Sequence, residues 1–402
     1  MLGFAAVVAA FQSPKGQAAD WPRWRGPNLN GISDEKDWSS QWPKEGPPIA
    51  WKASVGTGFA SVTVGGGRLF TAGNDEDKDT VYCLDAVTGL ELWKHSYNSD
   101  LGDKFFEGGP TATPTIDGDS VYALSRWGDL FCFDAAMGKV RWSKNVQKET
   151  GIRIPSWGFA SSPLVHGDLL LLNIGEAGMA VEKKSGALAW KSENRDAGYS
   201  TAVPFQRGQE SFAIFGTGKS YVAINVRTGR ELWRIPWLTS FGVNAADPIL
   251  EGDFIFLSSG YDKGAAVFKL DGAEPTVIWQ NKEMRNQFNS SVLLNGFLWG
   301  IDGDAGSAAT LKCLEFRTGQ MKWSEAGIGA GALMAADGKL IVLSESGALI
   351  VAAATSERFQ PISRAQVLGG KCWTVPVLAN GRIYCRNASG DLVCVDVRLN
   401  KP

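Results

Sequence analysis

The chain has 402 residues, of which 48 are Gly and 16 are Trp, so turns and large apolar anchors take an unusual share of it. Its two histidines are too few for a His-based metal cluster, and they disfavour a Ser-His-Asp triad. The charges are dispersed and sum to −2, so there is no basic field to attract nucleic acid. With 44% hydrophobic and 20% charged residues, the chain can fold around a sizeable core.

The N-terminus predicts export. An apolar run from Leu2 to Phe11 is followed by small residues up to Ala19, which is typical of a signal peptide over residues 1–19. The run is too short to cross a bilayer, which needs about 20 apolar residues, and no later stretch is longer, so no transmembrane anchor is expected. We therefore expect a mature protein in the periplasm or outside the cell. Residues 20–48 are rich in Trp and Pro and are expected to form an irregular strap against the side of the domain that follows, residues 49–402.

A repeat of roughly 45 residues runs through this domain. Each unit has an acidic residue or Asn, then usually Thr-Gly or an equivalent, then a Trp eight residues after the start, as in Asp85, Gly89 and Trp93. Such a large ring at a fixed position predicts packing between units and not ligand contact. The marker tryptophans are Trp51, Trp93, Trp142, Trp190, Trp233, Trp279 and Trp323.

The pattern within each unit predicts β-strands. Apolar runs of strand length, such as residues 120–124 and 130–133, are separated by turn dipeptides such as Asn380-Gly381. No helical period persists. Four short strands per repeat describe one blade of a β-propeller. The sequence therefore predicts an all-β fold, an eight-bladed propeller of four-stranded antiparallel blades.

The ends of the domain predict how the ring closes. The unit over residues 332–362 keeps the strand pattern but loses the Asp, Gly and Trp. The last unit reaches its acidic start at Asp396, so its Trp would fall beyond Pro402. The strand that contains Trp51 can supply this missing outer strand. We expect the N-terminal strand to join the C-terminal blade, which removes exposed sheet edges.

The cysteines follow the repeat. Cys83, Cys132, Cys313 and Cys394 each stand two residues before the acidic residue of their unit, so we expect small, buried third-strand residues. Cys385 and Cys394 face one another on a predicted hairpin and form the one pair for which a disulfide is an alternative. No Cys or His spacing indicates zinc.

Two segments carry a family resemblance. Residues 81–93 (VYCLDAVTGLELW) and 128–142 (GDLFCFDAAMGKVRW) resemble the PQQ-like propeller repeat. This repeat occurs in quinoprotein alcohol dehydrogenases and in the propeller subunit of the outer-membrane barrel-assembly machine. Residues 20–31 (DWPRWRGPNLNG) resemble the leader of exported PQQ-like repeat proteins of planctomycete-type bacteria. The resemblance implies the propeller fold and an exported protein.

The same resemblance raises the question of a cofactor. Quinoprotein dehydrogenases hold PQQ and Ca²⁺ at the ring centre, with a catalytic Asp and, in many members, two adjacent cysteines. This chain has no Cys-Cys pair, and Tyr261 stands where a calcium-binding Asn is expected. Residues 282–288 offer Glu283 but no Asp for the base, and only Glu176 matches a calcium carboxylate. PQQ and Ca²⁺ are therefore the alternative, and no catalytic residue is assigned.

A binding site is predicted where the innermost strands begin, because the residues before them converge on one rim of the central channel. Aromatic side chains with a few polar groups suit a ligand pocket or a peptide-binding face, although they would equally plug the channel as packing. Arg153 and Arg285 could pair with an anionic ligand, and residues 104–107 belong either to this rim or to a separate surface. Trp157 and Trp373 are the leading candidates. The candidate residues are Phe59, Arg153, Trp157, Phe159, Tyr199, Asn244, Asp247, Arg285, Asn289, Lys371 and Trp373.

Three functions compete. The first is an exported, monomeric, non-catalytic propeller that binds a protein, peptide or glycan of the cell envelope. The second is a PQQ- and Ca²⁺-dependent oxidoreductase acting on alcohols or sugars, in which the quinone accepts hydride. The third is an accessory factor in outer-membrane protein assembly.

Overall fold

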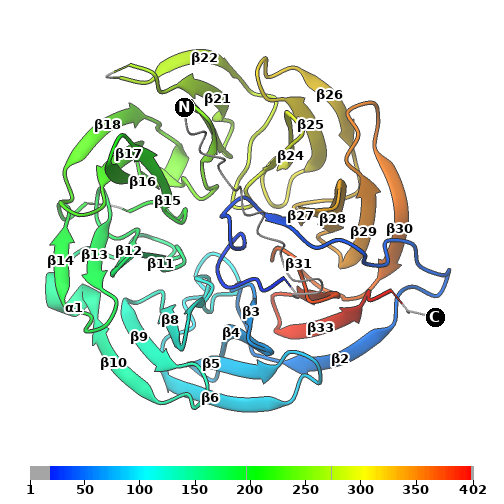
Figure 1. Cartoon of the computed structure of the whole chain (residues 1–402), viewed down its shortest axis with the longest axis horizontal. Coiled ribbons are helices and arrows are strands. Elements are labelled where there is room, and N and C mark those ends of the chain that lie inside the picture. The colour runs from blue at the N-terminus through cyan, green and yellow to red at the C-terminus, as the bar shows by residue number, and fades with distance from the viewer. Residues whose placement is uncertain (1–18, 196, 273, 400–402) are drawn as a thin grey trace, which may run out of the picture.

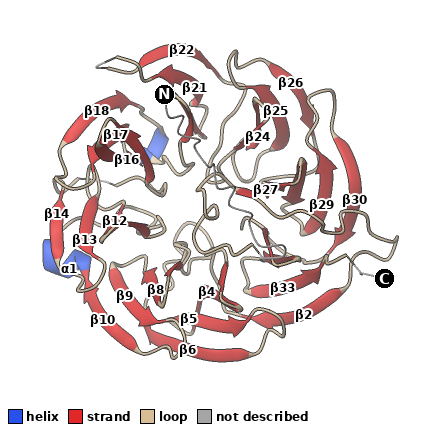
Figure 2. Cartoon of the chain, in the orientation of Figure 1, coloured by secondary structure: helices blue, strands red, loops and turns tan. Residues whose placement is uncertain are grey.

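The computed structural model describes residues 19–195, 197–272 and 274–399, so the predicted signal peptide lies outside the described residues except for Ala19. These residues form eight β-sheets arranged as a ring around a central channel (Figure 1). Helical structure within them is confined to α1 (Val146–Thr150) and the 3₁₀ turn η1 (Ser240–Gly242), as Figure 2 shows. The predicted all-β, eight-bladed propeller is confirmed.

Each blade is a four-stranded antiparallel meander whose first strand lines the channel. The first four blades comprise β3 (Thr63–Gly65), β4 (Arg68–Asp75), β5 (Lys78–Asp85) and β6 (Glu91–Asn98); β7 (Thr115–Asp117), β8 (Ser120–Leu124), β9 (Asp129–Asp134) and β10 (Val140–Asn145); β11 (Leu164–His166), β12 (Leu169–Leu172), β13 (Met179–Glu182) and β14 (Leu188–Lys191); and β15 (Val203–Arg207), β16 (Glu210–Gly216), β17 (Ser220–Asn225) and β18 (Glu231–Pro236).

The remaining blades repeat this order, except that the last one takes its outer strand from the N-terminal side of the chain. They comprise β19 (Ile249–Glu251), β20 (Phe254–Ser259), β21 (Gly264–Lys269) and β22 (Thr276–Asn281); β23 (Val292–Leu294), β24 (Phe297–Asp302), β25 (Thr310–Glu315) and β26 (Met321–Glu325); β27 (Ala332–Ala336), β28 (Lys339–Leu343), β29 (Ala348–Ala353) and β30 (Gln360–Gln366); and β31 (Val377–Ala379), β32 (Arg382–Arg386), β33 (Asp391–Asp396) and β2 (Ile49–Ser54).

The ring closes as predicted. β2 pairs with β33 in antiparallel register, with Trp51 opposite Cys394. Arg386 of β32 strengthens the closure, because its buried guanidinium donates hydrogen bonds to the carbonyls of Ala60 and Ala72 in the first blade. Desolvation lowers the pKa of Arg386 to about 9. The closing blade is therefore tied to the first by both a strand and a buried side chain.

The marker tryptophans clamp neighbouring blades together. Trp93 of β6 donates its Nε1 proton to the carbonyl of Ala135 in the next blade, at 3.0 Å. Gly138, in the turn of that next blade, has a φ of +69°, and a Cβ there would lie 2.5 Å from the Trp93 ring. The glycine of the motif is thus required both by the backbone and by the ring that covers it. The same donation to the next blade is made by Trp51, Trp142, Trp190, Trp279 and Trp323.

The cysteines are free and buried in the part of the chain that the structure describes. Those of β5, β9, β25 and β33 are core residues of third strands, as predicted. Cys385 lies opposite Val393, whereas Cys394 lies opposite Tyr384. Because adjacent residues of a strand point to opposite faces, the two sulfurs are on different sides of the hairpin. The alternative of a Cys385–Cys394 disulfide is wrong.

The strap, residues 20–48, runs differently from the prediction. Trp21 exchanges backbone hydrogen bonds with Val64 of the innermost strand β3, and β1 (Ile32–Ser33) adds in parallel to the innermost strand β27. The strap then passes outwards, where the backbone N–H of Trp42 donates to Ser363 Oγ of β30. In Figure 1 this dark-blue segment crosses the middle of the ring before it reaches the rim. It lies over one end of the channel, not only against the side of the propeller.

Candidate functional site

A belt of hydrogen bonds connects six of the eight blades just before their innermost strands. The backbone N–H of each belt residue except the last, Ser290, donates to the side-chain oxygen of the corresponding residue in the next blade, at 2.7–3.1 Å. Five side chains in the series are Ser or Thr, and the exception is Asp247. The belt fixes the rim without using the strand ladders. Its members, in order around the ring, are Ser61, Thr113, Ser162, Thr201, Asp247 and Ser290.

The strap forms the floor of the channel at Asp247. Trp24 Nε1 donates to Asp247 Oδ2 at 2.6 Å, and Arg25 Nε lies 3.8 Å from the same oxygen. The Arg25 guanidinium also donates to the carbonyl of Ser291 at 2.8 Å. Burial raises the pKa of Asp247, and the positive charge of Arg25 only partly opposes this. Both side chains are buried, so this end of the channel is sealed.

The strap seals the end at which the first hairpins turn. Asp20 accepts a hydrogen bond from the backbone N–H of Gly66, in the turn between β3 and β4. Glu35 accepts from the backbone N–H groups of Asn380 and Gly381, in the turn between β31 and β32. The opposite end, where the chain enters each innermost strand, is not covered by the strap. The channel is therefore a pocket that is closed at one end and open at the other.

This pocket has a volume of about 620 Å³, within the range of small-molecule sites. Nine lining residues have polar or charged side chains that are not aromatic, among them Thr201, Asp247 and Asn289. Another nine are aromatic. The aromatic lining residues are Trp24, Phe59, Phe105, Phe106, Trp157, Tyr199, Tyr261, Phe288 and Trp373.

The aromatic side chains gather in two groups. Trp373 stacks on Phe59, with ring centres 5.4 Å apart and planes 27° apart, and its other neighbour Phe288 is at 4.8 Å. Trp157 contacts Phe105 at 5.4 Å and the edge of Tyr199 at 6.0 Å. Such contacts hold the rings in fixed orientations, so the pocket presents flat apolar faces before a ligand arrives.

Charged groups at the pocket are compensated. Lys371 forms an ion pair with Glu107, and its Nζ lies 4.3 Å above the Trp373 ring. Glu345 accepts hydrogen bonds from Trp373 Nε1 at 2.9 Å and from the backbone N–H of Ala330 at 3.0 Å. The pocket thus offers polar groups without a free cation among the residues that line it in the structure.

Most of the predicted rim residues line this pocket, but two predicted ones face the core. Phe159 is buried between the second and third blades, while its neighbour Ala160 lines the pocket. Asn244 is buried and its amide donates to the carbonyls of Thr217 and Trp237, so it supports a loop. The predicted residues that line the pocket are Phe59, Trp157, Tyr199, Asp247, Asn289, Lys371 and Trp373.

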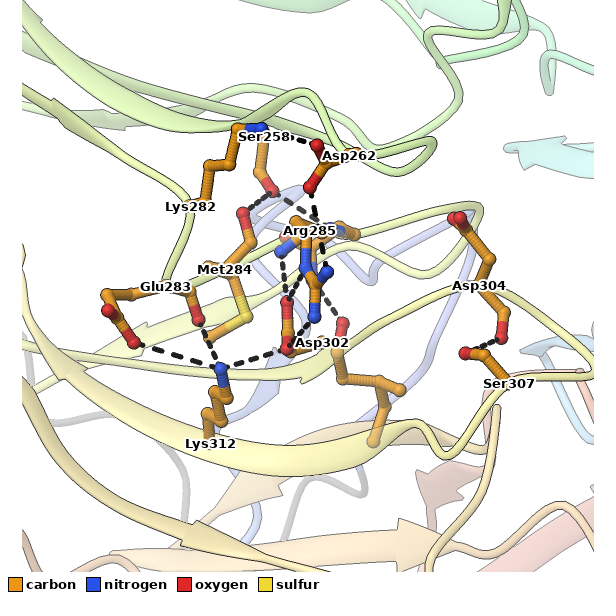
Figure 3. Close-up of polar contacts among 12 residues, drawn as sticks. Ser258, Asp262, Lys282, Glu283, Met284, Arg285, Asp302, Asp304, Ser307 and Lys312 are labelled. Carbon is orange, nitrogen blue, oxygen red and sulfur yellow. Dashed lines mark hydrogen bonds and ion pairs between the residues drawn. The ribbon is translucent and has the colours of Figure 1, made fainter. Parts of the chain in front are cut away.

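The arginines expected near the rim do not line the pocket. Arg285 donates Nε and Nη2 to the two carboxylate oxygens of Asp302, each at 2.9 Å (Figure 3). Lys312 Nζ completes this cluster at 2.9 Å from Asp302. Burial acts to raise the pKa of Asp302, but the hydrogen bonds from Arg285 and Lys312 outweigh it and lower that pKa. Arg285 is therefore held in an ion pair with Asp302. Arg153 is also not among the residues that line the pocket.

Glu176 does not occupy a metal site. Its carboxylate lies 3.4 Å from Arg195 and 3.3 Å from Arg234. Throughout the described ranges, no group of three or more His, Cys, Asp or Glu side chains could hold a metal ion. The carboxylate that the resemblance matched to calcium is instead paired with two guanidinium groups.

Several lining residues were not among the candidates. Trp24 reaches the pocket from the strap, and Phe105 and Phe106 come from the loop whose placement was left open. Gln287 joins them by donating to Tyr261 Oη at 3.0 Å. Gln287 lies two positions before the predicted Asn289, so a wider window before the innermost strand would have included it.

Comparison with known proteins places this geometry in a family. A family model described as "Outer membrane protein assembly factor BamB" matches residues 29–113 and 99–325. The chain belongs to this family of PQQ-like propellers. No curated protein matches the sequence significantly.

Solved structures agree on the fold. BamB from Moraxella catarrhalis is 16% identical, with a TM-score of 0.65 over 87% of this chain and 99% of that one. The quinohemoprotein alcohol dehydrogenase from Comamonas testosteroni is 13% identical, with a TM-score of 0.69 over 96% of this chain and 81% of that one. At these identities, the similarity of this PQQ-like propeller to both proteins shows the fold alone.

The donor set of the pocket differs from what PQQ and Ca²⁺ require. PQQ is a planar polycarboxylate and needs cationic partners, but Lys371 is held by Glu107 and the pocket adds the carboxylates of Asp247 and Glu345. Calcium takes about six to eight oxygen ligands. Both oxygens of Asp247 already accept N–H groups, from Thr201 and Trp24. The residues present do not fit either group.

Proposed function

We propose that this chain is an exported, non-catalytic binding module of the cell envelope that holds a protein, peptide or glycan in the channel pocket. The observation that carries the proposal is the pocket itself, which is sealed by the strap at Asp247 and lined by ordered aromatic rings. The hydrogen-bond belt fixes the backbone of the rim, so little conformational entropy is lost when a ligand binds.

The envelope location is supported by the apolar run over residues 2–11 and by the description of the family. Within the described ranges, no helix has the length and apolarity that crossing a membrane requires. Because β2 closes the last blade, the ring leaves no blade incomplete, and we propose that the protein acts as a monomer.

The proposal is tested by screening labelled full-length protein against glycan and peptide arrays, with the hits titrated by intrinsic tryptophan fluorescence. Trp373→Ala removes the stacked face of the pocket, so affinity should fall more than about tenfold. Trp127→Ala is the matched control, because Trp127 lies outside the lining and donates Nε1 to the carbonyl of Asp100. Equal affinities of the two variants would contradict a pocket-bound ligand.

The oxidoreductase alternative is not supported by the donor set of the pocket. This alternative can be tested directly by titrating the protein with PQQ and Ca²⁺ in the presence of alcohols or sugars and a dye acceptor. Saturable binding at micromolar PQQ together with dye reduction would overturn the non-catalytic proposal.

A role as an accessory factor in outer-membrane protein assembly is a second candidate, favoured by the family description. It differs from the first proposal in its partner, which would be a component of the assembly machine. A pull-down from envelope extract that recovers such components with the wild type, and loses them with Trp373→Ala, would support this role at the same pocket.

A further inference from the structure

A second cavity adjoins the channel pocket. It is a groove of about 490 Å³ whose lining includes Asp103, Phe106 and Glu107. Phe106 also lines the channel pocket, so one residue separates the two cavities. Glu107 of the groove forms an ion pair with Lys371 of the pocket, which connects the cavities a second time. One extended molecule could therefore occupy both.

The lining of the two cavities is acidic. In the described structure it contains four carboxylates, those of Asp103, Glu107, Asp247 and Glu345, and one ammonium, that of Lys371. Arg25 lies beside Asp247, and Lys371 is paired with Glu107. Glu345 accepts hydrogen bonds from two neutral donors, Trp373 Nε1 and the backbone N–H of Ala330, and neither brings a positive charge.

The aromatic rings of the mouth already hold cations of the chain itself. Lys371 Nζ lies 4.3 Å from the centre of the Trp373 ring, and the Arg126 guanidinium lies 5.1 Å from that of Phe106. The face of an aromatic ring is electronegative and attracts a cation. Trp373 thus has a carboxylate on two sides, Glu107 through Lys371 and Glu345 through its own Nε1 proton, but the Lys371 ammonium matches only the first.

Apolar rings continue beyond the pocket. Trp157 contacts Phe105 at 5.4 Å and Phe241 at 6.3 Å, and these two phenylalanines are 57% and 74% exposed. Contiguous exposed apolar side chains are typical of a surface that binds another molecule. A small cation would interact with the carboxylates but would leave these rings uncovered.

We propose that the ligand is a basic polypeptide segment, a proposal that rests on the binding function proposed above. Its Lys or Arg side chain enters the pocket beside Glu345 and Trp373, and its apolar side chains cover Phe105 and Phe241. Long basic side chains suit such a pocket, because their aliphatic stems pack on aromatic rings while the charged end reaches a carboxylate. An acidic segment would instead bring like charge to Glu345.

The test titrates the full-length protein calorimetrically with three short peptides that share one set of apolar residues and alternate them with Lys, Gln or Glu. Spermidine is the cation without apolar side chains. The Lys peptide should bind at least about tenfold more tightly than the Gln peptide, and its affinity should fall as the salt concentration rises. The Glu peptide should bind most weakly.

Charge variants locate the effect. Glu345→Gln keeps the size of the side chain but removes its charge, so affinity for the Lys peptide should fall about tenfold. Asp103→Asn, at an exposed position of the groove, should lower it about two- to fivefold without disturbing the fold. Asp168→Asn is the matched control, because Asp168 is exposed in the turn between β11 and β12, at the sealed end, and it should leave the affinity unchanged.

The outcomes separate the two proposals. The basic-peptide proposal is overturned if the Lys peptide has no advantage over the Gln peptide, if spermidine binds as tightly as the Lys peptide, or if neither Glu345→Gln nor Asp103→Asn weakens binding. In each of these cases, a peptide or glycan that binds and requires Trp373 leaves the binding function standing. If neither peptides nor glycans bind, both proposals fail.

Discussion

The two ends of the channel differ in how far their side chains are buried and paired. At the strap end, Trp24 and Arg25 are directed at Oδ2 of Asp247, and the backbone N–H of Thr201 donates to Oδ1, so both carboxylate oxygens have partners. At the mouth, Phe105 and Phe241 are 57% and 74% exposed, although both are large and apolar. Burial with full pairing stabilises the fold, whereas exposed apolar rings are available to a molecule that is not part of the chain.

Both ends of the channel contain a residue other than Gly with a positive φ, and at the sealed end this residue is Arg25, at +60°. Phe241 in η1 has a φ of +65°, a region that few residues other than Gly adopt. Its ring meets Trp157 and Tyr261 in edge contacts at 6.3 Å and 5.7 Å. The strained residue thus extends the aromatic wall beyond the rim, and strain of this kind is commonly found at functional sites.

The largest expected effect concerns the sealed end. Arg25→Met leaves the Asp247 carboxylate buried without its cation, so we expect the free energy of unfolding to fall by about 3 kcal/mol. Urea denaturation followed by tryptophan fluorescence measures it. The double variant Arg25→Met, Asp247→Asn removes both charges and should recover much of the loss. A change of less than about 0.5 kcal/mol in the single variant would show that the strap does not stabilise the ring.

The second largest expected effect comes from comparing two tryptophans of the strap, Trp24 and Trp42. Trp24→Phe removes a hydrogen bond to a buried carboxylate, for which we expect a loss of about 2 kcal/mol in the free energy of unfolding. Trp42→Phe is the control, because Trp42 Nε1 donates to the neutral carbonyl of Ser39 near the surface. Its loss should be smaller. Equal losses would mean that the floor of the pocket is no more tightly held than the outer part of the strap.

Asp247 and Asp302 should respond to pH in opposite directions. Both are buried, at 5% and 3% exposure, but burial raises the pKa of Asp247, whereas the hydrogen bonds of Arg285 and Lys312 lower that of Asp302. Stability linked to a raised pKa is present below the ordinary value for Asp and is lost as pH rises through the raised one. For Asp302, stability is present above the ordinary value and is lost as pH falls through the lowered one.

These opposite slopes appear when wild type is compared with Asp247→Asn and Asp302→Asn by urea denaturation between about pH 3 and pH 7. The stability difference from Asp247→Asn should shrink with rising pH, and that from Asp302→Asn should grow. One titrating proton limits either slope to about 1.4 kcal/mol per pH unit. Slopes of the same sign would contradict the electrostatic distinction between the channel floor and the Arg285 cluster.

The blades were predictable because each motif acts locally. Asp85 Oδ1 accepts the backbone N–H groups of Val87 and Thr88 and so shapes the turn that Gly89 completes. The Trp51 ring then covers Gly89, where a Cβ would lie 2.5 Å from it. Each residue of the motif has a structural role that can be inferred from its neighbours in the sequence. The number of times the motif is repeated then gives the number of blades.

The pocket was predictable only in part because its remaining residues depend on distant ones. Trp24 and Asp247 are 223 positions apart, and no local pattern connects them. A position before an innermost strand gives the correct end of the blade but not the direction of the side chain, which is why Phe159 faces the core while Ala160 faces the channel. Arg285 was misplaced because its partner, Asp302, comes from β24, the second strand of the following blade.

The belt should show an intermediate effect. Ser162→Ala deprives the backbone N–H of Thr113 of its acceptor, and we expect the free energy of unfolding to fall by about 1 kcal/mol. Ser185→Ala, in an exposed turn of the same blade, should change it less. Hydrogen exchange of the Thr113 amide should accelerate only in the first variant. An unchanged exchange rate would show that the strands alone hold the rim.

The smallest expected effect on the free energy of unfolding is at the mouth of the pocket, where we expect almost no change. Thr374→Val removes a hydroxyl that has no partner within the described chain, so the free energy of unfolding should stay within about 0.5 kcal/mol of wild type or rise slightly. Thr113→Val is the matched comparison, because its hydroxyl accepts the N–H of Ser61 in the belt, and that variant should be destabilised. Equal losses in urea denaturation would mean that the Thr374 hydroxyl supports the fold. A loss confined to Thr113→Val would show that the fold uses the hydroxyl of the belt residue and not that of Thr374.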